Sequence, residues 1–66
     1  MPIVVNGEAR QWEPGETILD LLGALEIEPA RVAVELNRGI VRAADWGATE
    51  LPDGAEVEIV QFVGGG

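Results

Sequence analysis

Three consecutive glycines, Gly64, Gly65 and Gly66, are the residues of this chain whose type and spacing suggest chemistry. Ordering each of them costs roughly 1–2 kcal/mol of backbone entropy, and a glycine brings no side chain to a core. A frayed end or a cloning remnant would explain them without any function. The functional alternative is a chain end that enters a narrow active site of another protein and presents the Gly66 carboxylate there.

Side chains able to catalyse a reaction are scarce. The chain has no cysteine and no histidine, which removes thiol nucleophiles, zinc–thiolate sites and the commonest general base. Any reaction carried out by side chains would depend on carboxylates and arginines alone. The sequence therefore predicts a protein that is not an independent enzyme, has no metal site and binds no cofactor of its own.

The charge balance restricts the class of partner. Twelve acidic residues face four arginines, there is no lysine, and the net charge is -8. Phosphate backbones and anionic lipid surfaces would repel such a chain, so we expect neither nucleic acid nor membrane partners. The acidity serves either solubility or docking to a basic protein. We also expect a cytoplasmic protein, because the first 25 residues lack a signal-peptide pattern and no apolar run approaches ~20 residues.

The predicted last strand, residues 56–63, leads directly into the glycines. Glu56 and Glu58 cannot face a small core, so the odd-numbered positions are expected to point inward. Val60 and Phe62 then lie side by side on the outer face, at the root of the tail. They form either a docking patch or, if the strand twists late, part of the rim of the core.

The clearest helix signal begins at Thr17, a good N-cap residue, with Asp20 completing a pattern that resembles a capping box. A single apolar stripe follows at helical spacing: Ile18, Leu21, Leu22 and Leu25. Gly23 weakens helix propensity and suggests a close approach of the helix to a sheet. Pro29 bounds the helix on its C-terminal side.

The remaining segments predict strands. Asn6-Gly7 favours a hairpin turn between residues 3–5 and 8–13, with Trp12 joining Ile3 and Val5 on one side. Apolar residues alternate over 32–36 and indicate a half-buried strand. Asn37-Arg38-Gly39 then predicts a tight turn into a short strand at Ile40-Val41, and a helical turn is expected around Trp46.

A hairpin, a helix, a strand pair and a final strand together predict an α+β fold of the β-grasp, ubiquitin-like type. One main helix packs on one face of a mixed sheet. We expect a single domain over residues 1–63 and a flexible tail over residues 64–66.

Over essentially its whole length the chain resembles the thiamine-biosynthesis sulfur carrier family (ThiS). The segments that carry the resemblance are Ile3 to Gly7, Thr17 to Leu22, Val32 to Asn37, Ile40 to Arg42 with Trp46, Leu51 with Asp53-Gly54, Val57 to Val60, and Val63 to Gly66. The closing segment is the most specific. One departure is Val41, where the family often has a proline before the arginine.

The resemblance implies a mechanism and a set of partners. An E1-like adenylyltransferase would use ATP and magnesium to convert the Gly66 carboxylate into an acyl-adenylate, with Gly64 and Gly65 threading its active site. Val60 and Phe62 would dock on that partner. A persulfide-bearing sulfur donor would then leave a thiocarboxylate on Gly66, and thiazole synthase would take the sulfur.

Three other functions fit the same pattern. The small subunit of molybdopterin synthase shares the fold, the tail and the activation chemistry, and differs in the sulfur acceptor. A protein modifier would be joined through Gly66 to lysines of target proteins. A passive β-grasp interaction module would have a tail without function.

Overall fold

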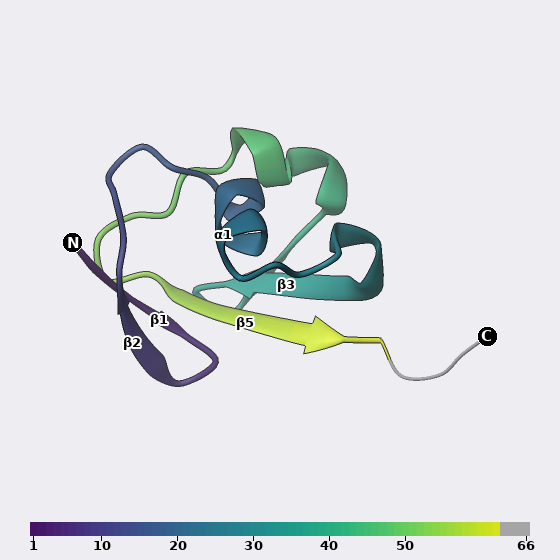
Figure 1. Ribbon diagram of the computed structural model, residues 1–66, viewed down its shortest axis with the longest axis horizontal. Helices are drawn as coiled ribbons and strands as arrows, with labels where there is room; N and C mark the ends of the chain where they lie inside the picture. Colours follow the sequence, from purple (N-terminus) through teal and green to yellow (C-terminus); the bar gives the residue numbers. More distant parts are fainter. Residues whose placement is uncertain (63–66) are drawn as a thin grey trace.

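The computed structural model describes residues 1–62. They form a five-stranded mixed sheet with one α-helix on one face (Figure 1). The strands are β1 (Pro2–Val5), β2 (Glu8–Gln11), β3 (Val32–Leu36), β4 (Gly39–Val41) and β5 (Glu56–Gln61). The helical elements are α1 (Ile18–Ala24) and the 3₁₀ helices η1 (Pro29–Arg31) and η2 (Ala43–Ala48).

β5 is the central strand of the sheet, whose order is β2-β1-β5-β3-β4. It runs parallel to β1 and antiparallel to β3, and the two outer pairs are antiparallel hairpins. The α-helix and η2 cover the same face of this sheet (Figure 1). This is the β-grasp arrangement that the sequence predicts.

Both hairpins use turns whose two central residues have positive φ. In the first turn Asn6 and Gly7 have φ of 49° and 83°, and in the second Asn37 and Arg38 have φ of 49° and 73°. Positive φ at both positions is the hallmark of the type I′ turn, which matches the twist of the flanking strands. The two predicted turns are confirmed, but the second places an arginine where the first has glycine.

We expect Arg38→Gly to stabilise the protein by roughly 0.5–1 kcal/mol. Glycine adopts the left-handed conformation without the steric cost of about 1–2 kcal/mol that arginine has there. The greater conformational freedom of glycine in the unfolded chain cancels part of this gain. Urea denaturation measures the change. Gly7→Arg is the matched reverse variant, because a Cβ at Gly7 would meet nothing within 4 Å and only the backbone cost changes. An Arg38→Gly variant no more stable than the parent would contradict this prediction.

The start of α1 is the predicted capping box. The Thr17 hydroxyl accepts a hydrogen bond from the Asp20 backbone N–H at 3.2 Å, and the Asp20 carboxylate accepts one from the Thr17 N–H at 2.8 Å. Ile18, Leu21 and Leu22 are buried beneath the helix. The stripe predicted from the sequence therefore faces the sheet.

The end of α1 differs from what the sequence suggests. The helix stops at Ala24, well before Pro29, because Glu26 adopts a left-handed φ of 57°. The Ile27 N–H then donates to the Leu22 carbonyl at 2.9 Å, and the Glu26 N–H donates to the Gly23 carbonyl at 3.1 Å. This is a Schellman cap with glutamate at the position that glycine usually takes.

Gly23 does not mark a close approach of the helix to the sheet. A Cβ built there would meet nothing within 4 Å, so that expectation is wrong. The residue lies on the exposed side of α1.

The core lies between the sheet and the helical layer. Its buried residues are Ile3, Val5, Trp12, Ile18, Leu21, Leu22, Val32, Val34, Trp46, Leu51, Ala55 and Val57. Trp12 joins Ile3 and Val5 as predicted, and Trp46 lies in η2 at 3% exposure. No polar or charged residue is buried within the part of the chain that the structure describes.

Candidate functional site

The backbone is held by hydrogen bonds up to Phe62, two residues before the predicted tail. The Phe62 N–H donates to the Arg31 carbonyl at 2.8 Å, one position beyond the Gln61–Val32 pair of the β5–β3 ladder. Val63 and the predicted site residues Gly64, Gly65 and Gly66 lie outside the described residues. Their roles in activation therefore stay predictions. The strand that leads toward them, β5, lies wholly within the described residues.

Asn6 has a second role beyond its turn. Its side-chain Oδ1 accepts a hydrogen bond from the Ile59 N–H at 2.7 Å, and its Nδ2 donates to the Ile59 carbonyl at 3.3 Å. Its own backbone N–H donates to the Val57 carbonyl at 2.9 Å. The side-chain amide thus continues the parallel pairing with β5 where β1 has already turned away.

Asn37, in the other hairpin turn, holds the first residue of the same strand. Its Oδ1 accepts from the Glu56 N–H at 2.9 Å, and its backbone N–H donates to the Glu56 carbonyl at 2.7 Å. β5 is therefore bonded by an asparagine from each turn. Sequence reasoning assigned both asparagines to turn formation alone, because a local pattern carries no signal for a partner 53 or 19 residues away.

Val60 and Phe62 are both exposed, at 55% and 63%. Val57 is buried and Ile59 is partly buried against the core, so the inward phase of β5 is as predicted through Ile59. The alternative in which the strand twists late and packs both residues on the rim of the core is wrong. Two apolar side chains are thus presented to solvent next to the start of the tail, and their docking role remains a prediction.

The outward face of the sheet beside these residues is acidic. Glu35 and Glu58 lie directly opposite each other in the β3–β5 register, and their strand neighbours Val34 and Val57 are buried, so both glutamates point away from the core. Like charges in directly opposed positions destabilise a sheet. A basic partner surface would relieve that repulsion and would be attracted to this face.

Within residues 1–62 no group of three or more histidine, cysteine, aspartate or glutamate side chains is placed to hold a metal ion. No helix in that range is long and apolar enough to cross a membrane. What the described site offers is an anchored strand, two exposed apolar side chains and an acidic face.

A sequence model of the ThiS family matches residues 3–66, which includes the closing glycines. This chain belongs to the ThiS family. A family member from Bacillus subtilis, named sulfur carrier protein ThiS, is 40% identical over 63 residues, covering 94% of this chain and 96% of that protein.

Two further comparisons bear on fold and context. The crystal structure of a thiamine biosynthesis protein (ThiS) from Geobacter metallireducens superposes with a TM-score of 0.84, at 33% identity and with 100% of both chains covered. A thiazole synthase of Paramagnetospirillum magneticum is 41% identical over 66 residues, which are 100% of this chain and 20% of that protein. The chain thus spans a fifth of the length of that larger relative.

Proposed function

We propose that this chain is a sulfur carrier for the thiazole moiety of thiamine, with the sulfur held as a thiocarboxylate on Gly66. The observation that carries the proposal is membership of the ThiS family over residues 3–66, because the match continues through the glycines. Full-length relatives named sulfur carriers support a carrier that acts as a co-substrate of other enzymes. The presence of a similar segment within thiazole synthases supports thiazole synthase as the sulfur acceptor.

The proposed chemistry begins with activation of a poor electrophile. A carboxylate oxygen of Gly66 attacks the α-phosphorus of ATP on an E1-like adenylyltransferase, pyrophosphate leaves, and an acyl-adenylate forms. Magnesium on that partner stabilises the charge on the phosphates. A persulfide sulfur then attacks the acyl carbon and expels AMP. A thiol cleaves the resulting sulfur–sulfur bond, which leaves the thiocarboxylate.

The composition of the chain suits this chemistry. Without cysteine, the chain has no thiol to attack the acyl-adenylate, and without lysine it has no side-chain amine to do so. No side-chain thiol or amine of this chain therefore competes with the external sulfur donor for the acyl-adenylate on Gly66. The acidic outward face with Val60 and Phe62 suits docking on a partner with a basic and apolar surface.

Intact mass spectrometry after co-expression with the adenylyltransferase and a sulfur source tests the proposal. We expect the mass gain of one oxygen replaced by sulfur, localised to Gly66 by fragmentation and lost on alkaline hydrolysis. The same spectrum establishes whether Gly66 is the last residue of the mature protein. An unmodified carboxylate with an active partner would refute the carrier chemistry. Tight binding to a molybdopterin synthase large subunit and none to thiazole synthase would refute the acceptor.

Phe62→Ala is expected to weaken binding to the adenylyltransferase by about 30-fold, the loss typical of an aromatic hot spot at the centre of an interface. Stability should change by less than about 0.5 kcal/mol, because the side chain is 63% exposed. Calorimetric titration measures the first quantity and urea denaturation the second.

Leu19→Ala is the matched control for this experiment. Leu19 is an exposed apolar residue at 46%, but it belongs to α1 in the helical layer and is far from β5 in the sequence. Its replacement should leave partner affinity within about twofold of the parent, as expected for a residue outside the interface. Equal losses in the two variants would show that β5 is not the docking strand.

A further inference from the structure

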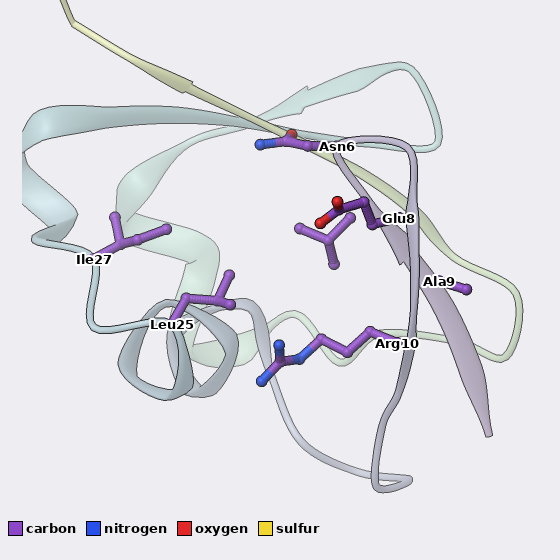
Figure 2. Close-up of a pocket in the computed structure, with 7 residues that line it drawn as sticks. Asn6, Glu8, Ala9, Arg10, Leu25 and Ile27 are labelled. Carbon is purple, nitrogen blue, oxygen red and sulfur yellow. The ribbon is translucent and has the colours of Figure 1, made fainter.

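A pocket of about 330 Å³ lies between the first hairpin and the segment that follows α1. Figure 2 shows its lining residues, among them Asn6, whose side chain also holds β5. They are Val5, Asn6, Glu8, Ala9, Arg10, Leu25 and Ile27. The volume is at the small end of the range for pockets that bind small molecules.

The pocket forms beside β2, because this strand carries charged residues on the face of the sheet that most of the other strands pack against the core. Glu8 pairs with Val5 and Arg10 with Ile3, so both charged side chains project on the side of the buried Val5 and Ile3. β2 is an edge strand, and α1 ends at Ala24. The short helix leaves the helix-facing side of this edge partly uncovered.

Arg10 is left with an unmet hydrogen bond in this pocket. Its Nε has essentially no exposed surface and has no hydrogen-bond partner among residues 1–62. A water molecule does not reach that atom, so an incoming acceptor must be bound by the terminal Nη groups of the guanidinium. A carboxylate fits them best, because two parallel N–H groups can donate to its two oxygens.

The two charges lie at different ends of the pocket. Figure 2 shows the Glu8 carboxylate on the side of Asn6, and the Arg10 guanidinium reaching toward α1 near Leu25. Val5, Leu25 and Ile27 supply apolar surface around the space. The lining thus offers a cationic end, an apolar middle and an anionic end.

We propose that this pocket binds a small zwitterion that carries a carboxylate and an ammonium group on an apolar body. The carboxylate accepts hydrogen bonds from Arg10, the body contacts Leu25 and Ile27, and the ammonium faces Glu8. The net charge of -8 favours a zwitterion over a simple anion, which the field of the whole chain would repel. The proposal is independent of the function of the tail, because Val60 and Phe62 lie on β5 outside this lining.

The test is a titration of the isotope-labelled chain with 4-(aminomethyl)benzoate, followed by NMR. We expect saturable shifts of the backbone amides of Val5, Ala9, Leu25 and Ile27, with a Kd of roughly 1 mM for a ligand of this size. The Arg10 backbone amide, which belongs to the same lining, should shift with the same saturation curve. 4-Methylbenzoate and 4-methylbenzylamine each lack one charged group and should bind at least about tenfold more weakly.

Variants locate the site. Arg10→Gln should weaken binding of the zwitterion at least about tenfold, whereas Arg38→Gln, in the exposed second hairpin turn, should leave it unchanged. The amide shifts of the unmodified chain give an answer even if Arg10→Gln fails to fold. Either the absence of saturable shifts or equal binding by a folded Arg10→Gln variant would overturn the proposal.

Discussion

Replacing Gly65 with tryptophan is expected to slow activation by the adenylyltransferase about 100-fold or more, while the fold stays intact. A residue beside the reacting carboxylate must pass with it into the active site of the partner. Misplacing a reacting group by about 1 Å is enough for a loss of this size. Partner-dependent exchange of pyrophosphate into ATP measures the rate of activation, and circular dichroism checks the fold.

Gly23→Trp is the matched control, since it adds the same side chain far from the tail. Gly23 lies on the exposed side of α1, and a Cβ there would meet nothing within 4 Å. The control variant should therefore be activated at a rate near that of the parent. If the Gly65 variant reacted equally fast, a threaded glycine tail would no longer explain the sequence.

The second large effect is expected for Trp46→Ala, which should remove about 3–5 kcal/mol of stability. Trp46 is 3% exposed, and its Nε1 donates to the Val41 carbonyl at 2.9 Å. At roughly 0.05–0.15 kcal/mol per residue, a chain of this length has only about 3–10 kcal/mol to lose. Much of the variant should therefore be unfolded at room temperature.

Trp46→Phe separates packing from hydrogen bonding at this position. The smaller ring keeps most of the apolar contact and removes the donor to Val41, so a loss of about 1–2 kcal/mol is expected. Urea denaturation followed by circular dichroism compares both variants with the parent. A loss below about 1 kcal/mol in Trp46→Ala would show that η2 contributes little to the core.

The fold was predictable because its signals are local and agree with one another. Asn6-Gly7 specifies a turn, the Thr17–Asp20 pair begins the helix, and alternation over residues 32–36 gives a strand. The sequence also placed Val60 and Phe62 on the outer phase of the strand, since glutamates in the same phase cannot face a small core, but it left open a late twist onto the rim of the core, which their exposure rules out. Each inference needed only the neighbours within one element.

The features that the sequence did not predict depend on contacts between elements, or on backbone conformations that the residue type does not indicate. The end of α1 is set by Glu26 in a left-handed conformation, for which a glutamate gives no sign. The hydrogen bonds from Asn6 to Ile59 cross 53 residues. Glu8 and Arg10 appear as an ordinary charged edge strand until the register places them on the helix-facing side.

The parallel pairing of β1 with β5 has a mechanical consequence. When β1 and β5 are pulled in opposite directions along the strands, parallel neighbours slide past each other, so the hydrogen bonds between them bear the load together. The amide of Asn6 adds two more bonds at that boundary. If a partner enzyme draws the last residues into its active site, as proposed, it pulls β5 along the strand, which is the direction in which the sheet resists most, and the fold can bear that force without unfolding.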